Sequence, residues 1–555
     1  MTKPKATFRR AVTISLSLGL LYCSYELGII RSELSNHRLE LPEVNYISRH
    51  FKSNLNDSDW VPAEFPLRES PTRPFSKQAP DDVDKDVDKG VELGDTHLST
   101  DLPNAASHKA LSPACHDLPG AEDVVVVVKT GATEAFARVP EHLLTLSRCI
   151  PNLMIFSDLE QDIGDFHIYD ALSEVSDEYK NNNEDFEFYH TLQKYHAEHR
   201  DVSVLSSDKG WNLDKWKNIP MLHAAYQRYP DAQWFVFIDA DSYIGWINLL
   251  QLLRRLDSTK PLYFGAIYVY GETAFAQGGT GYGVSKAAVK RFEKIRDAEH
   301  IAAWEHETST ICCGDVMLSI ALHDAGVNVS GAWPLLQPEP PSMLDWSDQV
   351  WCRPAVSWHH VHAFEVEALW HFEQAWINQT KTSERVGHRI CFSLPPSRLI
   401  ACTVTDPSFF SKAGQIPYLY KDAFEYFVQP HISDTRSDWN NLSRDRTFTE
   451  PTEDHPKEGN DWDWLSDEEK QSMWDGWSDL QKKSVESAED CYAACEVDEG
   501  CMQYLFRPGS CSHNWAIRLG HATEPDSDTT SGWMLDRLEQ FKQAQANCDP
   551  SWALD

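Results

Sequence analysis

Three short apolar runs constrain the fold of this 555-residue chain more than any other feature. Val124–Val128 is five consecutive valines, and Asn152–Phe156 and Gln233–Ile238 are similarly apolar. A run without polar alternation predicts a strand buried on both faces, as in parallel sheets. Helical patterns alternate with these runs, so the sequence predicts an α/β fold with ligands beyond the carboxyl ends of the strands. The helices are expected at Pro220–Tyr229, Asn248–Leu256, Ser285–Ile295 and Asp315–Ala325.

The amino terminus carries the pattern of a membrane anchor. Basic residues within residues 1–10 precede an apolar run at 11–30, which is long enough to span a bilayer as a helix. Positive charge before the run favours a cytoplasmic amino terminus. We expect a cytoplasmic tail at 1–10, a signal-anchor at 11–30 and a polar, disordered stem at 31–112. A cleaved signal peptide is the alternative.

Cysteines and glycosylation sequons indicate the secretory pathway. One of the 13 cysteines, Cys23, lies in the apolar run, which leaves an even number for disulfides. Asn-X-Ser/Thr sequons indicate the same compartment. They lie at Asn56, Asn328, Asn378 and Asn441. The net charge of −35 repels phosphate backbones, so we expect no nucleic-acid partner.

Changes in composition divide the rest of the chain. The first folded domain is expected at 113–430, and a polar linker follows at 431–469. A compact Cys-rich module is expected at 470–548.

The sharpest chemical signal is the segment Phe237–Tyr243, in which Asp239 and Asp241 follow an apolar strand. Carboxylates two residues apart on a strand point to the same side, and their oxygens suit Mn²⁺ or Mg²⁺. Such an ion can bind the two phosphates of a nucleotide-sugar and stabilise a departing diphosphate. A solvated turn is the alternative, because Asp-X-Asp is a common tripeptide, but the preceding strand favours a metal site.

Several sequence blocks follow one another between about Cys115 and Pro430. They are VVVVVKTG at 124–131, IFSD at 155–158, GWNLDKWKNIPM at 210–221, FIDADSY at 237–243, GGTGYGVS at 278–285, CGDVML at 313–318 and SWHHVH at 357–362. In these blocks the chain resembles glycosyltransferase family 31, which includes fringe-type and core 1 β1,3-galactosyltransferases, and most strongly its fungal-type branch. The resemblance implies a GT-A fold (a Rossmann-like mixed sheet flanked by helices), a UDP-sugar donor, Mn²⁺, and inversion at the anomeric carbon to form a β1,3 linkage. Many relatives have a third acid where this chain has Ala240, so Asp241 is the expected direct ligand and Asp239 the supporting one.

The same resemblance implies a base and a further metal ligand. Asp315 matches the carboxylate that deprotonates the acceptor hydroxyl, which a single inverting displacement needs. An acid in the first turn of a helix is the structural alternative for this residue. His359 matches the histidine that completes the Mn²⁺ shell in the core 1 branch, although His360 or His362 also fit.

Residues at the strand ends complete the implied donor site. Lys217 matches a lysine that precedes the metal strand and is expected to meet a phosphate. Thr130, Gly131 and Asp158 end the first two strands and are the expected contacts of uridine and ribose. The glycine-rich loop at 278–283 is interpreted as a close-approach loop near the sugars, with a tight structural turn as the alternative.

The module at 470–548 resembles a PAN/Apple domain, a small disulfide-rich α+β fold, through Cys491, Cys495, Cys501 and Cys511. The resemblance implies that Cys495 pairs with Cys501 and Cys491 with Cys511, whereas the sequence alone allows three connectivities. Such modules bind carbohydrate or protein. We hypothesise that Cys548 pairs with a cysteine of the first domain and ties the two together.

These features predict an inverting β1,3-glycosyltransferase with a luminal catalytic domain, anchored as a single-pass type II protein in the Golgi or ER membrane. Its expected donor is a UDP-sugar, with galactose favoured and N-acetylglucosamine second, and its expected acceptor is a glycan on glycoprotein or glycolipid. A non-catalytic carbohydrate-binding membrane protein built on a degenerate transferase domain is the alternative, because the middle acid is lost at Ala240. A retaining GT-A enzyme is a third possibility.

Overall fold

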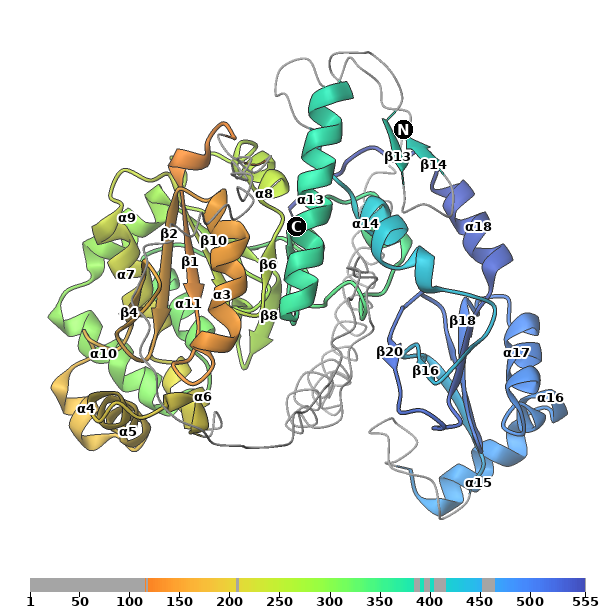
Figure 1. Cartoon of the computed structure of the whole chain (residues 1–555). Coiled ribbons are helices and arrows are strands. Elements are labelled where there is room, and N and C mark those ends of the chain that lie inside the picture. Colours follow the sequence, from red (N-terminus) through yellow and green to blue (C-terminus); the bar gives the residue numbers. More distant parts are fainter. Residues whose placement is uncertain are drawn as a thin grey trace, which may run out of the picture. The chain divides into compact units, whose positions relative to one another are not determined.

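The structure, a computed structural model, describes residues 115, 118–205, 209–383, 390–393, 400–403, 416–451 and 465–554 (Figure 1). The described parts of 63–453 and 467–555 belong to one compact unit. The expected tail at 1–10, anchor at 11–30 and stem at 31–112 lie outside the described residues. Within the described ranges, no helix combines the length and apolar character needed to cross a bilayer.

An eight-stranded mixed sheet forms the centre of the first domain, in the order β11-β7-β10-β5-β1-β2-β4-β3. Strands β5, β1, β2 and β4 run parallel to one another, whereas β10 runs antiparallel to both β5 and β7. In sheet order the strands span Val329–Gly331, Tyr263–Gly265, Tyr282–Ser285, Trp234–Asp239, Val124–Lys129, Asn152–Ser157, Phe166–Asp170 and Gln161–Ile163. This mixed α/β sheet fits a GT-A-like fold.

The valines of β1 are buried on both faces of the sheet, which confirms the prediction from the valine run. Val124, Val126 and Val128 belong to one hydrophobic cluster, and Val125 and Val127 belong to another. Successive side chains of a strand point to opposite faces, so β1 supplies both halves of the core.

Helices cover the two faces of the sheet (Figure 1). The cluster of Val124 includes residues of α3 (Ala135–Leu144), α8 (Trp246–Leu253), α13 (Ala363–Ser383) and α14 (Tyr420–Phe427). The cluster of Val125 includes residues of α7 (Asn218–Arg228), α9 (Lys286–Ile295), α10 (Ala298–Thr310) and α11 (Gly314–Asp324). The four predicted helices correspond to α7, α8, α9 and α11. A third cluster joins α5 (Phe186–Ala197) to α6 (Gly210–Asp214).

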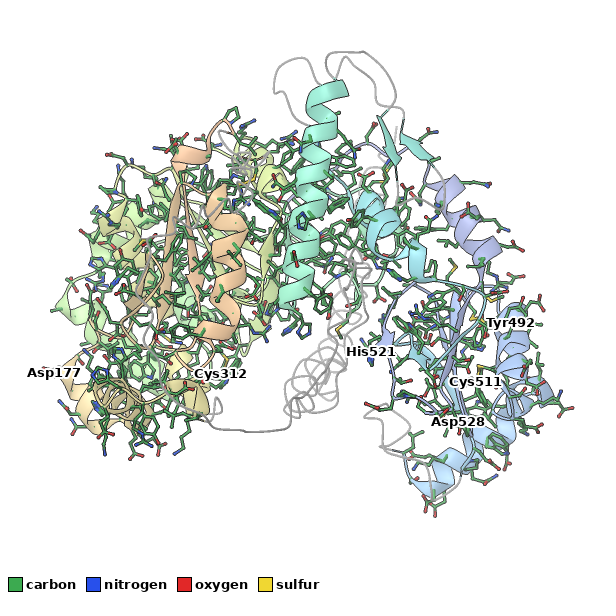
Figure 2. The ribbon with its side chains drawn as sticks, in the orientation of Figure 1. Asp177, Cys312, Tyr492, Cys511, His521 and Asp528 are labelled. Carbon is green, nitrogen blue, oxygen red and sulfur yellow. A yellow bond between two sulfur atoms is a disulfide. The ribbon has the colours of Figure 1, made fainter. Side chains whose placement is uncertain are left out.

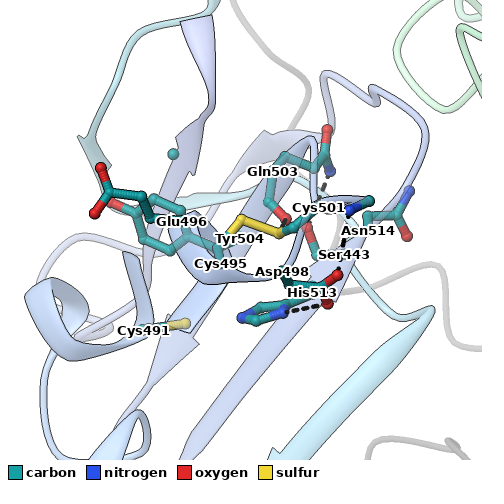
Figure 3. The surroundings of a disulfide bond; sticks show 12 residues. Ser443, Cys491, Cys495, Glu496, Asp498, Cys501, Gln503, Tyr504, His513 and Asn514 are labelled. Atoms are coloured by element: carbon teal, nitrogen blue, oxygen red, sulfur yellow. Dashed lines mark hydrogen bonds and ion pairs between the residues drawn. A yellow bond between two sulfur atoms is a disulfide. The ribbon is translucent and has the colours of Figure 1, made fainter. Parts of the chain in front are cut away.

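The C-terminal module contains an antiparallel five-stranded sheet in the order β15-β21-β18-β19-β17. In that order the strands span Arg436–Ser437, Thr530–Trp533, Gln503–Arg507, Ser510–Asn514 and Arg446–Thr449. Helix α17 (Ala488–Val497) is joined to β19 by the Cys491–Cys511 disulfide. A second disulfide, Cys495–Cys501, lies beside Asp498 and His513 (Figure 3). Both pairings are those that the PAN/Apple resemblance implies.

The expected linker at 431–469 needs a correction. Strands β15 and β17 lie within it and pair with β21 and β19 of the module, so the module begins earlier than residue 470. These edge strands have two and four residues, too few to show a period-2 pattern in the sequence. Residues 452–464 lie outside the described ranges.

The same part of the chain changes the interpretation of one sequon. Asn441 is fully buried, and its side-chain amide donates to the carbonyl of Tyr504 at 2.9 Å. The folded chain therefore cannot carry a glycan there, whereas Asn328 and Asn378 are exposed.

The module and the first domain share contacts and a covalent link. Cys548 forms a disulfide with Cys352, which confirms the hypothesis that it pairs with the first domain. Arg518 makes a two-pronged ion pair with Asp345, with Nε and Nη2 at 2.5 and 2.9 Å from the carboxylate oxygens. Module residues also belong to the hydrophobic cluster of Val124. They are Trp439, Ile517, Leu519, Trp533 and Leu538.

Candidate active site

The two aspartates after β5 have different neighbours. Asp239 ends β5 and lies opposite Lys129 of β1 in the parallel register. Its carboxylate is 3.3 Å from Nζ of Lys129, which also lies 2.5 Å from the carboxylate of Asp214 in α6. Burial raises the pKa of Asp239, and the charge of Lys129 only partly offsets this effect. The Asp239 carboxylate therefore forms an ion pair with Lys129.

Asp241 instead meets two histidines, because two short strands pair. Strand β6 (Tyr243–Ile244) runs antiparallel to β12 (Ser357–Trp358), and the Val361 N–H donates to the carbonyl of Asp241 at 2.9 Å. The Asp241 carboxylate lies 3.5 Å from Nε2 of His359 and 3.5 Å from Nδ1 of His360. Burial opposes ionisation, but the two imidazoles more than offset it and hold the pKa of Asp241 well below its usual value.

These three side chains fit the predicted cation. One carboxylate oxygen of Asp241 and one ring nitrogen each of His359 and His360 all lie within 4.8 Å of one another. Carboxylate and imidazole together suit Mn²⁺. The predicted set of Asp239, Asp241 and His359 thus has two members in this group, with His360 as the third member and Asp239 paired with Lys129.

The glycine-rich loop links this group to Asp315. The N–H of Gly278 donates to Oδ2 of Asp315 at 2.9 Å. A Cβ on the next residue, Gly279, would lie 2.1 Å from Nε2 of His359, so the imidazole packs directly against this glycine. Because neighbouring Cα atoms are about 3.8 Å apart, Asp315 and His359 flank one stretch of backbone. Two side chains of the site thus approach the loop backbone closely. The loop also contains the tight turn of the structural alternative, because the Gly281 N–H donates to the Gly278 carbonyl at 3.0 Å. Its approach to a sugar stays a prediction.

Two serines fix the position of this loop. The hydroxyl of Ser242, next to Asp241, donates to the Gly279 carbonyl at 2.6 Å. The hydroxyl of Ser357, two residues before His359, donates to the Thr280 carbonyl at 2.5 Å. The segments that carry the metal-binding candidates are therefore bonded to the loop that contacts Asp315.

Asp315 has the basicity of a proton acceptor. It lies in the first turn of α11, where Gly314 permits close packing, since a Cβ there would lie 2.5 Å from Oδ1 of Asn218. Burial raises the pKa of Asp315 to about 6, although the Gly278 N–H acts in the opposite direction. Such a carboxylate is mostly ionised at neutral pH and is a stronger base than an exposed aspartate. Asp315 can therefore be both the acid in the first turn of α11 and a base.

Lys217 is more enclosed than a phosphate-binding role suggests. Its Nζ donates to the carbonyl of Thr130 at 2.9 Å and lies 3.6 Å from the carboxylates of both Asp158 and Asp214. Only 2% of Lys217 is exposed. These contacts hold the ends of β1 and β2 against α6, so Lys217 positions the site in this structure.

The other predicted nucleotide contacts lie beside Lys217 at the ends of β1 and β2. Thr130 and Asp158 are buried, and Oδ1 of Asp158 accepts a hydrogen bond from the Ala132 N–H at 2.6 Å. Gly131 is half-buried, and its N–H donates to Glu134 at 3.3 Å. Of the three, Gly131 alone leaves part of its surface exposed to solvent.

Sequence reasoning missed the roles of Lys129 and Asp214. Burial lowers the pKa of Lys129, but Asp214 and Asp239 more than offset this effect, so its pKa is raised and it stays charged. Lys129 directly follows the five valines. Its position at the end of a predicted strand is the sequence feature that could have identified it as a site residue. The register that places it opposite Asp239 is a property of the sheet alone.

Comparisons with known proteins indicate a glycosyltransferase. The model of the galactosyl transferase GMA12/MNN10 family matches residues 155–251, a range that includes β5 and the Asp239–Asp241 segment. The curated glycoprotein-N-acetylgalactosamine 3-beta-galactosyltransferase 1 of Xenopus laevis is 31% identical over 114 residues, which are 20% of this chain and 31% of that protein. The chain thus matches about a third of the length of this relative.

A solved structure, a glycosyltransferase involved in the glycosylation of the major capsid of PBCV-1, also matches. It is 15% identical and covers 44% of this chain and 98% of its own, with a TM-score of 0.18. The family model and the curated relative support glycosyl transfer as the role of the chain, without fixing the family or the sugars.

Proposed function

We propose that this chain is a Mn²⁺-dependent, inverting β1,3-glycosyltransferase of the Golgi or ER membrane. The proposed donor is UDP-galactose, with UDP-N-acetylglucosamine second. The proposed acceptor is N-acetylgalactosamine on a glycoprotein or glycolipid. The name of the curated relative supports both the sugar and the acceptor, because that protein is a galactosyltransferase of glycoprotein N-acetylgalactosamine.

One observation carries this proposal. Gly278 contacts Asp315 and Gly279 contacts His359, so a base of raised pKa and a group suited to a cation flank the same two residues. An inverting transfer needs these two functions on either side of the anomeric carbon.

The proposed reaction is a single displacement. The carboxylate of Asp315 accepts the proton of an acceptor hydroxyl, and the hydroxyl oxygen forms a bond to the anomeric carbon. The bond from that carbon to the β-phosphate oxygen breaks, and its electron pair leaves with UDP. Because attack and departure occur on opposite faces, the anomeric configuration inverts.

The residues on the metal side stabilise charge. Mn²⁺ bound by Asp241, His359 and His360 would supply positive charge to the departing diphosphate. Lys129 balances Asp239 and Asp214, so the carboxylates near the site do not all repel the incoming donor. Lys217 holds the ends of β1 and β2 together next to the site.

A donor screen of the purified full chain tests this function. UDP-galactose and UDP-N-acetylglucosamine are offered with p-nitrophenyl N-acetyl-α-galactosaminide, with and without Mn²⁺, and UDP release and the product anomer are measured. We expect Mn²⁺-dependent transfer of galactose into a β-linked product. Glycan binding without turnover of either donor would favour the non-catalytic alternative, and an α-linked product would favour a retaining enzyme.

A further inference from the structure

The disulfide between Cys312 and Cys313 differs from the other disulfides of the described residues. It joins adjacent residues, whereas the others join residues at least six positions apart. A disulfide stabilises a fold mainly by closing a loop in the unfolded chain, and a bridge between neighbours closes almost none. Neither cysteine belongs to a hydrophobic cluster of the described residues. Stability therefore does not account for this bridge.

The disulfide lies close in sequence to Asp315, the proposed base. Cys313 is the N-cap residue of α11, and Asp315 follows two residues later in the first turn. Helical side chains tilt toward the amino terminus of their helix, so the Asp315 carboxylate and the disulfide lie at the same end of α11. Cys312, labelled in Figure 2, is exposed, and Cys313 is half-buried. The bridge is thus accessible and lies at the same helix terminus as Asp315.

This helix terminus is held firmly. A Cβ on Gly314 would lie 2.5 Å from Oδ1 of Asn218 and 2.8 Å from the carbonyl of Lys215, so the helix terminus packs closely on its neighbours. The Gly278 N–H donates to the Asp315 carboxylate and fixes it in place. The disulfide closes a small covalent ring, which removes torsional freedom from the residues just before α11. The chain just before Asp315 is therefore a rigid segment that carries two sulfur atoms.

We propose that the Cys312–Cys313 disulfide forms part of the acceptor-binding surface and contacts the apolar C–H face of the acceptor sugar. An acceptor hydroxyl must approach Asp315 to within about 3 Å, which brings the sugar ring close to the residues at this end of α11. Sulfur is polarisable and packs well against apolar groups. The bridge increases the affinity for the acceptor and orients it, while Asp315 accepts the proton of the acceptor hydroxyl. The inference rests on the proposed function, because that function makes Asp315 the base.

A double variant tests this role through the two Michaelis constants. C312S/C313S removes the ring while retaining the size and position of both side chains. We expect the KM for p-nitrophenyl N-acetyl-α-galactosaminide to rise roughly tenfold, the effect of losing one small apolar contact. The KM for UDP-galactose should stay within about twofold of wild type, and the unfolding temperature should change little because the bridge closes almost no loop.

The matched control lies in the same segment. Ser309 and Thr310 end α10, and their hydroxyls donate to the carbonyls of His306 and Glu307 of the same helix. S309A/T310A alters two residues five and four positions before the start of α11 without touching the bridge, so both KM values should match wild type. An acceptor KM of C312S/C313S that equals wild type overturns the inference, as does an equal rise in both KM values.

A measurement on the wild-type chain covers the case in which the variant folds poorly. The bridge is reduced with a mild phosphine, trapped by alkylation and followed by mass spectrometry of the peptide that contains it. Saturating p-nitrophenyl N-acetyl-α-galactosaminide with UDP and Mn²⁺ should slow this reduction several-fold relative to UDP and Mn²⁺ alone. An unchanged rate would overturn the inference even when turnover is normal, whereas a wild-type chain without turnover would overturn the proposed function itself.

Discussion

At the scale of single residues, chemical roles follow from neighbours. Asp239 and Asp241 are two positions apart and have the same side chain, yet one pairs with Lys129 and the other with two histidines. The sequence places both acids after one strand, but the register of β1 and the pairing of β6 with β12 decide what each one meets. The assignment of Asp241 as the direct ligand and Asp239 as the supporting one stays a prediction, and these contacts distinguish the two acids.

Replacement of Asp241 tests the cation group. Asp241→Asn removes the negative charge that draws His359 and His360 together, so we expect Mn²⁺ affinity to fall and turnover to drop at least about 100-fold. Mn²⁺ titration followed by electron paramagnetic resonance measures the affinity. Asp231→Asn, an exposed acid whose carboxylate is 3.9 Å from Lys286, is the matched control and should behave as wild type. Normal Mn²⁺ binding by Asp241→Asn would contradict the assignment.

The raised pKa of Asp315 predicts the pH dependence of transfer. Asp315 accepts a proton only as the carboxylate, and its pKa is about 6. The rate should therefore be nearly constant above about pH 7 and fall about tenfold per pH unit well below pH 6. The profile of kcat/KM for the acceptor measures this, with Mn²⁺ kept saturating at each pH.

Asp315→Asn separates the base from the binding site. We expect UDP affinity to stay within a few-fold of wild type, because the variant keeps the shape of the side chain, while transfer falls by at least about 100-fold. Isothermal titration with UDP and Mn²⁺ measures the first quantity and product formation the second. A large loss of UDP binding would argue against the role as base.

At the scale of elements, the long apolar strands could be predicted and the short ones could not. Strand β1 has five valines, and their burial on both faces specifies a central strand. Strands β6 and β12 have two residues each and show no periodicity, although their pairing brings Asp241 to His359. The glycine-rich loop could be recognised in the sequence from its composition. Its contacts with Asp315 and His359 could be found only in the folded structure.

Two neighbouring glycines allow a sharp test of that loop. A Cβ on Gly279 would overlap the His359 ring at 2.1 Å, whereas a Cβ on Gly278 would make ordinary contacts with Asp315 at 3.6 and 3.8 Å. Gly279→Ala should therefore displace His359 and lower Mn²⁺ affinity by roughly tenfold or more. Gly278→Ala should have a much smaller effect in the same Mn²⁺ titration. Equal behaviour of the two variants would show that packing of His359 on the loop is unimportant.

At the scale of the whole molecule, the C-terminal module is part of the folded unit. It contributes Trp439, Ile517 and Trp533 to the hydrophobic cluster of the first domain, and Arg518 binds Asp345. The module is therefore connected to the first domain by packing, by an ion pair and by the Cys352–Cys548 disulfide.

Removal of that disulfide should lower stability. Cys352 and Cys548 are 196 positions apart, so the bridge restricts a very long loop in the unfolded chain. We expect C352S/C548S to lose roughly 3–5 kcal/mol in the free energy of unfolding. Denaturant unfolding measures the change, with C312S/C313S as a control bridge that closes almost no loop. Unfolding curves that coincide with wild type would contradict the prediction.

The sequence by itself determined the α/β class, the central strands and helices, and the residue types of the site, because long apolar runs and carboxylates at strand ends depend on local order along the chain. Only the tertiary structure decided that Lys129 pairs with Asp239, that His360 joins Asp241, and that Lys217 is enclosed. It also placed residues 436–437 and 446–449 in the C-terminal five-stranded sheet and buried Asn441. These outcomes depend on strand register and on contacts between segments more than 60 residues apart, and such contacts leave no periodic signal in one sequence.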